Sequence, residues 1–160
     1  MHMNQKESLS LINEAMDIEL NASHLYGLIG KLFPEDSEFW VQLSYEEKKH
    51  ASLMKNCEEY FLSNPDFPEE LFSMDINQLR EANSMIKTCI DQFTSTQPSK
   101  AIAFKRALEI EESSGEIHYQ KQITGETNNR LLKIFQTMYR EDTDHLERIR
   151  EYMENNDISL

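Results

Sequence analysis

Residues 40–61 read WVQLSYEEKKHASLMKNCEEYF, and the spacing of their apolar side chains is that of a helix with one buried face. The residues on that face recur every three or four positions: Trp40, Leu43, Glu47, His50, Met54, Cys57 and Phe61. A carboxylate and a histidine therefore stand in the middle of an otherwise apolar series. Because burying an isolated carboxylate costs free energy, the pair predicts a positively charged partner in the core.

Three other stretches show the same interrupted pattern. The inward series of the first is Ile12, Ala15, Glu19, Ala22, Tyr26 and Ile29. A later stretch carries Phe104, Ala107, Glu111 and Ser114, with His118 beyond them. The last one carries Leu131, Phe135, Met138, Asp142, His145, Ile149 and Tyr152. Each of the four series has a carboxylate near its middle, so the four carboxylates are expected to meet at one level of the core.

The breaks between these stretches predict an all-α fold. Helices are expected at about residues 7–32, 35–62, 76–93, 99–123 and 127–154, with turns where proline and glycine interrupt the pattern. Short turns join the first two helices and the last two, which favours two antiparallel hairpins. The residues between the hairpins, with their own amphipathic helix, form a long crossover. The expected architecture is a four-helix bundle in a single domain over residues 1–160.

Composition narrows the class of function. The chain has 160 residues, of which 39% are hydrophobic and 28% charged, and its formal net charge is -13. Such a charge repels nucleic acid and anionic membranes, so neither is an expected partner. Only two cysteines are present, and they do not form a Cys-x-x-Cys pair. Zinc-ribbon and rubredoxin-type sites are therefore excluded, and a reducing cytoplasm is the expected location.

The two halves of the chain repeat a ligand pattern. The motif Glu47-x-x-His50 returns as Asp142-x-x-His145, and each half also has a helix with one inward Glu, Glu19 or Glu111. Residues three apart share a helical face, so both side chains of each motif can reach one ion. Two divalent cations would balance four carboxylates. The histidines favour iron, manganese or zinc over calcium and magnesium.

This set of residues resembles the ligand scheme of the ferritin-like superfamily, and within it the rubrerythrin branch. The resemblance covers the chain from about Leu9 to Met153. It implies a non-haem di-iron oxidoreductase that reduces peroxide or dioxygen and protects against oxidative stress. The metal ligands that it implies are Glu19, Glu47, His50, Glu111, Asp142 and His145.

Two positions depart from the family pattern. Asp142 stands where the family usually has Glu, and Ser114 occupies a position that often carries a further Glu. Rubrerythrins also commonly carry a rubredoxin domain, whose cysteine pairs are absent from this sequence, so we expect the electrons to come from a separate donor protein. A homodimer is the expected assembly.

Several alternatives stay open at this level. Glu141 is an alternative to Asp142 as the inward carboxylate, and His118 is more typical of a core residue than of a ligand. Ordinary core packing is the favoured interpretation of Tyr26, and a place beside the metal ligands, as hydrogen-bond partner of a carboxylate or near a bound oxygen species, is the alternative. A bacterioferritin-type ferroxidase or storage protein is the second functional hypothesis, and a metal-free helical interaction module is the third.

Overall fold

The computed structural model describes residues 5–63, 75–118, 128 and 130–160. In these ranges the chain forms five α-helices and one short 3-10 helix, and no β-strand. They are α1 (Gln5–Leu32), η1 (Pro34–Asp36), α2 (Ser37–Ser63), α3 (Ile76–Ser95), α4 (Lys100–His118) and α5 (Arg130–Asn155). The all-α prediction is confirmed. The fourth helix was predicted to reach Ile123, which lies outside the described residues.

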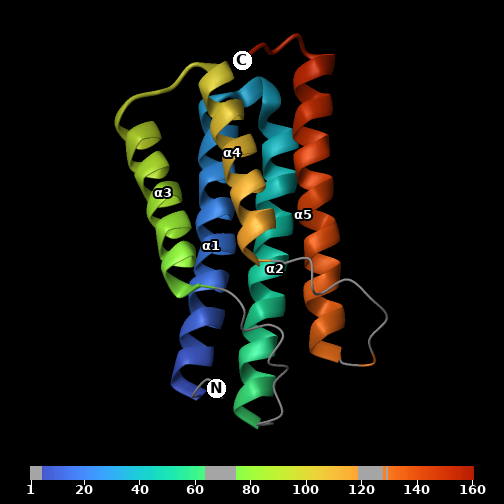
Figure 1. Ribbon diagram of the computed structural model, residues 1–160. Helices are drawn as coiled ribbons and strands as arrows, with labels where there is room; N and C mark the ends of the chain where they lie inside the picture. Colours follow the sequence, from blue (N-terminus) through green and yellow to red (C-terminus); the bar gives the residue numbers. More distant parts are fainter. Residues whose placement is uncertain (1–4, 64–74, 119–127, 129) are drawn as a thin grey trace.

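The axes of the helices are roughly aligned, and successive helices run in opposite directions (Figure 1). The long helices α1 and α2 lie side by side in opposite directions, and α4 and α5 do the same. The helix α3 packs against α1 and also touches α4. Further contacts join α1 to α4 and α2 to α5. The residues between the two long pairs thus include a helix that lies along the flank of α1.

The turn between α1 and α2 is tight because proline starts a short helix there. Pro34 begins η1, and the amide of Asp36 donates to the carbonyl of Phe33 at 3.0 Å. Close to this turn, α1 and α2 approach each other at Gly30. A Cβ atom added there would lie 3.1 Å from the Cβ of Trp40. A larger residue at position 30 would therefore push the two helices apart.

The predicted inward series are the core of the structure. All six residues of the α1 series are buried, as are six in the α2 series; the seventh, Phe61, has no described side chain. On α5, Met138, His145 and Ile149 are buried and Tyr152 is half-buried, whereas the side chains of Leu131 and Phe135 lie outside the described set. The three-and-four spacing therefore identified the buried faces correctly.

Aromatic rings and a small polar network close the bundle at the α1–α2 turn. The rings of Phe39 and Tyr152 stack with their centroids 4.1 Å apart, and the ring centroids of Phe104 and Trp40 are 4.7 Å apart. The hydroxyl of Tyr152 donates to the buried carboxylate of Asp36 at 2.9 Å. Lys100 pairs with that same carboxylate at 2.7 Å. These contacts fix the end of α5 against α2 and so set the register of the residues further along the core.

A buried amide attaches α3 to α1. Asn83 donates to the backbone carbonyl of Glu14 at 2.9 Å and accepts from the side chain of Asn21 at 2.9 Å. The apolar face of α3, from Leu79 to Phe93, is buried as its periodicity predicts. Among the described residues, no helix has an apolar stretch of the length needed to cross a bilayer.

Candidate metal centre

Five of the six predicted ligands come together in the middle of the bundle. Glu19 comes from α1, Glu47 and His50 from α2, Glu111 from α4 and His145 from α5. No member of this set has more than 5% of its surface exposed. Each lies on the inward face of its helix, where three-and-four spacing places it among apolar neighbours. The centre is thus assembled by four helices from distant parts of the sequence.

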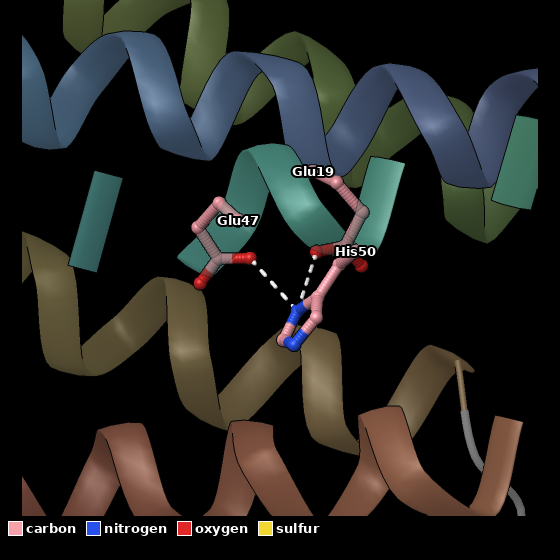
Figure 2. A group of neighbouring side chains, drawn as sticks. All are labelled: Glu19, Glu47 and His50. Carbon is pink, nitrogen blue, oxygen red and sulfur yellow. Dashed lines mark ion pairs between the residues drawn. The ribbon is translucent and has the colours of Figure 1, made fainter. Parts of the chain in front are cut away.

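The first group of ligand atoms surrounds the Nδ1 atom of His50. The carboxylates of Glu19 and Glu47 approach this nitrogen at 3.4 and 3.3 Å. Figure 2 shows both carboxylates converging on the same nitrogen, one from α1 and the other from the turn of α2 that precedes His50. We call Glu19, Glu47 and His50 the His50 group.

The second group surrounds the Nδ1 atom of His145. The Oε1 atom of Glu47 lies 2.9 Å from this nitrogen, and the Oε1 atom of Glu111 lies 3.8 Å from it. We call Glu47, Glu111 and His145 the His145 group. In each group the candidate ligand atoms all lie within 4.8 Å of one another. Both groups are able to hold a metal ion.

Glu47 belongs to both groups. Its Oε2 atom faces His50, while its Oε1 atom faces His145. The two imidazole rings are nearly parallel, with their centroids 5.6 Å apart and an angle of 21° between their planes. A carboxylate that presents one oxygen to each of two adjacent positions has the geometry of a bridging ligand. The sequence predicted Glu47 as a ligand, but its place between the two histidines follows only from the tertiary structure.

The outer nitrogen of each histidine contacts a second carboxylate. The Nε2 atom of His50 lies 2.7 Å from Glu141 on α5, and the Nε2 atom of His145 lies 2.8 Å from Glu46 on α2. The arrangement is reciprocal, because each of these glutamates immediately precedes the carboxylate position of the opposite motif. Since an ionised carboxylate can only accept a hydrogen bond, Nε2 is the donor in both cases. The contact fixes the orientation of the ring and directs Nδ1 into the centre.

These outer carboxylates were only partly anticipated. Glu46 was missed, and Glu141 was considered only as an inward alternative to Asp142. The available signal was the acidic residue that directly precedes the carboxylate in both motifs, Glu46-Glu47 and Glu141-Asp142. Such a residue is one helical position, about 100°, away from the inward face, so it can reach a neighbouring helix at the edge of the core.

Tyr26 contacts the centre directly. Its side chain is fully buried, and its hydroxyl donates to the Oε1 atom of Glu111 at 2.5 Å. The ring also lies beside Trp40, with centroids 5.6 Å apart. Tyr26 therefore packs in the core and also donates to a candidate ligand, whereas a part for it in catalysis stays a prediction.

The electrostatics of the site centre on Glu47. Burial alone would raise the pKa of this carboxyl, but hydrogen bonds from His145, His50 and Glu19 outweigh it and lower the pKa to about 2. Each imidazole faces carboxylates on both of its nitrogens. On the Nδ1 side, either a second ring proton or a bound cation is needed to balance the negative charge of the carboxylate oxygens. A metal ion can take the place of that proton, since ligands bind metals in their deprotonated form.

Three positions considered in the sequence have side chains outside what the structure describes. Asp142 lies on α5, but its side chain is not among those described, and the same holds for Ser114 and His118 on α4. The role of Asp142 as the sixth ligand therefore stays a prediction. His24, which is off the inward series of α1, is exposed.

Apolar side chains seal the centre on the side away from the α1–α2 turn. A cluster of buried residues continues the inward series of α1, α2 and α5 there and comprises Ile12, Ala15, Met54, Cys57 and Met138. The aromatic core around Trp40 covers the opposite side. The ligand atoms thus lie in a low-dielectric environment, which strengthens their interaction with a cation.

The donor set suits first-row transition metals. Carboxylate oxygens and imidazole nitrogens together are typical ligands of iron, manganese and zinc, whereas calcium and magnesium prefer oxygen alone. No protein-family model, curated protein or solved structure matches this chain, so the assignment of the centre depends on the geometry of its own residues.

Proposed function

We propose that this chain is a di-iron oxidoreductase of the rubrerythrin type, with a ferritin-like bundle, that reduces peroxide or dioxygen using electrons from a separate donor protein. The observation that carries the proposal is the position of Glu47, which presents one carboxylate oxygen to each of two buried histidines. A mononuclear site has no need of two such histidines around one shared carboxylate. The arrangement therefore favours two adjacent ions.

The arrangement of the helices supports the same proposal. In the first pair, α1 supplies Glu19 and α2 supplies the motif Glu47-x-x-His50; in the second pair, α4 supplies Glu111 and α5 supplies His145. This is the ligand distribution of ferritin-like di-metal bundles, one Glu from each of two helices and a carboxylate–histidine motif from each of the others.

The charges of the ligand set fit two divalent ions. In the proposed site, Glu47 would be shared by both ions, and Glu19 and Glu111 would each hold one ion. Asp142 completes the set on the basis of its motif, and its side chain is one methylene shorter than the usual Glu. Four negative charges then face four positive ones, so the loaded core is close to neutral.

Peroxide reduction consumes two electrons and two protons and releases two molecules of water. Ferrous ions supply the two electrons when bound, and the donor protein restores them. The residues of the chain do the remaining work. His50 and His145 would each hold one ion, the outer carboxylates Glu141 and Glu46 hold the rings in place, and the Tyr26 hydroxyl holds a proton against Glu111. The apolar surroundings limit the access of competing ligands.

The first test is metal content by plasma mass spectrometry on untagged protein reconstituted anaerobically with ferrous iron. We expect about two ions per chain in the native protein. Because both groups share Glu47, Glu47→Gln should lower the content of both, whereas Glu19→Gln should remove mainly one ion. Glu59→Gln, an exposed substitution on the same helix, is the matched control. Native protein that holds no iron under these conditions would contradict the proposal.

The second test separates peroxide reduction from iron storage. Ferrous protein should consume hydrogen peroxide stoichiometrically and should turn over when a chemical reductant is supplied. A storage protein would instead accumulate many ferric ions per chain, and it requires a hollow shell of many subunits. Size-exclusion chromatography of the loaded protein distinguishes a small oligomer from such a shell. A shell that mineralises iron would replace the oxidoreductase proposal.

A further inference from the structure

The two ligand groups differ in what lies behind their histidines. Behind His145, the carboxylate of Glu46 also accepts from Arg148 at 2.7 Å and from Gln42 at 2.6 Å. Behind His50, the carboxylate of Glu141 is 42% exposed, against 19% for Glu46. Within the described part of the chain, no cationic side chain pairs with Glu141 apart from the His50 ring. One outer carboxylate is thus paired with an arginine, and the other has no such cationic partner among the described residues.

The difference arises where the sequence repeat breaks down. Arg148 stands three residues after His145 on α5, and the residue three after His50 on α2 is Leu53. Leu53 is half-buried and packs against the apolar cluster of Ile12, Ala15, Met54, Cys57 and Met138. In the same way, Gln42 lies four residues before Glu46, and Thr137 takes the corresponding place before Glu141. The reciprocal contacts between histidines and carboxylates are therefore present in both halves, but the groups that support them are not.

The carboxylate of Glu111 in the His145 group is also engaged by a donor. It accepts from the Tyr26 hydroxyl at 2.5 Å, so part of its lone-pair density is already committed. A cation in the His145 group would therefore meet a hydrogen-bonded ligand carboxylate and, behind its histidine, an outer carboxylate paired with a guanidinium. Both features reduce the attraction between that position and a cation.

We propose that the two metal positions have unequal affinities: the His50 group binds the tighter ion, and Arg148, acting through Glu46, makes the His145 group the weaker and more exchangeable one. The inference rests on the proposed two-metal centre and adds an order of filling to it. Arg148 does not touch the ion. It is a positioning residue that sets the charge behind His145.

A competing effect has to be weighed, because Arg148 also holds Glu46 in place. If that role dominated, loss of the arginine would loosen His145 and weaken metal binding. Gln42 and His145 contact the two oxygens of Glu46 independently of Arg148, so the carboxylate should stay anchored at both oxygens when Arg148 is replaced. The change in charge should therefore decide the outcome. It leaves Glu46 a stronger partner for the His145 ring and a source of uncompensated negative charge near the ion.

The test is calorimetric titration of the metal-free protein with cobalt(II) at fixed ionic strength, with the absorption of bound cobalt recorded in parallel. Native protein should bind two ions in two resolved steps. Arg148→Gln should tighten the second step by about tenfold, the lower end of what outer contacts contribute to metal affinity, and leave the first nearly unchanged. Arg148→Lys keeps the charge and should preserve the difference in affinity between the two steps. Arg150→Gln removes a charge from the same helix, where Arg150 pairs with the exposed Glu112 at 2.8 Å, and should leave both steps as they are.

The outcomes separate this inference from the proposal beneath it. Two ions that bind with equal affinity in native protein would overturn the inference while supporting the two-metal centre. The inference also fails if Arg148→Gln leaves the difference in affinity between the two steps unchanged, weakens the second step, or acts no differently from Arg150→Gln. None of these results would contradict the two-metal centre. Protein that binds no cobalt at all would contradict the metal centre itself.

Discussion

The Nε2 atom of His145 on α5 donates a hydrogen bond to the carboxylate of Glu46 on α2 at 2.8 Å, and the two residues are 99 positions apart in sequence. The contact joins the two long helical pairs directly beside the candidate metal centre. Glu141 and His50 make the mirror contact, at 2.7 Å. Both histidines are therefore oriented by a carboxylate that belongs to the opposite helix.

Removal of this orienting carboxylate should weaken metal binding without removing a ligand. We expect Glu46→Gln to lower the affinity of the His145 group about 10- to 100-fold, because the histidine loses a charged hydrogen-bond acceptor. Cobalt(II) titration measures the change, and circular dichroism checks that the helices are intact. Glu58→Gln, on the same helix and outside the centre, is the control. An unchanged second binding constant in Glu46→Gln would show that the contact does not orient the ring.

Metal should stabilise the folded chain, because its ligands come from four helices. Ligand that binds only the native state at about 100 times its dissociation constant adds about 2.7 kcal/mol to the free energy of unfolding. We therefore expect thermal unfolding at a higher temperature with ferrous iron or cobalt(II) than after removal of metal by a chelator. Glu47→Gln should show little of this difference. An unfolding temperature of the native protein that is the same with metal and with chelator would contradict the proposed metal centre.

The polar network at the α1–α2 turn should contribute to stability. Asp36 is buried, accepts from the Tyr152 hydroxyl and pairs with Lys100, so Asp36→Ala removes the acceptor of that hydroxyl and one of the two carboxylates beside the ammonium group. We expect a loss of about 1–3 kcal/mol in the free energy of unfolding, measured with urea. Glu35→Ala is the natural comparison, because Glu35 also pairs with Lys100 but is exposed, and it should change stability much less. Equal effects of the two substitutions would refute the role of burial.

A buried amide contributes to the attachment of α3, beside the apolar face of that helix. Asn83→Leu replaces it with a side chain of similar size that cannot bond the Glu14 carbonyl or the Asn21 amide. The expected loss in the free energy of unfolding is about 1–3 kcal/mol. Ser84→Ala, at the exposed neighbouring position, should have little effect in the same urea experiment. If Asn83→Leu proves as stable as the native chain, the amide does not hold α3 in place.

The buried thiols should react slowly in the native state. Burial raises the pKa of Cys57 from 9.0 to about 11, and it also raises the pKa of Cys89. A raised pKa means less thiolate at a given pH, so at pH 8 the reactive fraction of Cys57 is about 100-fold below that of a free thiol. Ellman's reagent should therefore label the folded chain slowly and both cysteines rapidly in denaturant. Rapid labelling of Cys57 in folded protein at pH 8 would contradict its burial.

Periodicity alone located most of the core. The spacing of Glu19, Glu47, Glu111 and His145 among apolar residues placed them on inward faces, and the structure confirms that each is buried. The reason is physical: a helix that packs against others must bury one face, and the residues on that face recur every three or four positions. Local signals also placed the ends of α1, α2 and α3 to within two residues, since proline acts on its immediate neighbours, whereas α5 begins at Arg130 rather than near residue 127.

Contacts between helices could not be obtained in the same way. Glu46 and Glu141 lie beside the inward faces, and periodicity cannot say which neighbouring helix such a residue meets. The same limit applies to the hydrogen bond from Tyr26 to Glu111, which joins residues 85 positions apart. These relationships depend on the rotation and offset of each helix relative to its neighbour.

The sequence by itself thus determined the all-helical fold, the buried faces and the residue types that meet inside the bundle, because each depends on interactions within one helix. The tertiary structure alone decided that Glu47 lies between the two histidines, that each histidine is held by a carboxylate of the opposite helix, and that, among the described residues, only His145 has an arginine behind that carboxylate. Those features depend on distances between helices, which are set by how all the side chains of the core pack together.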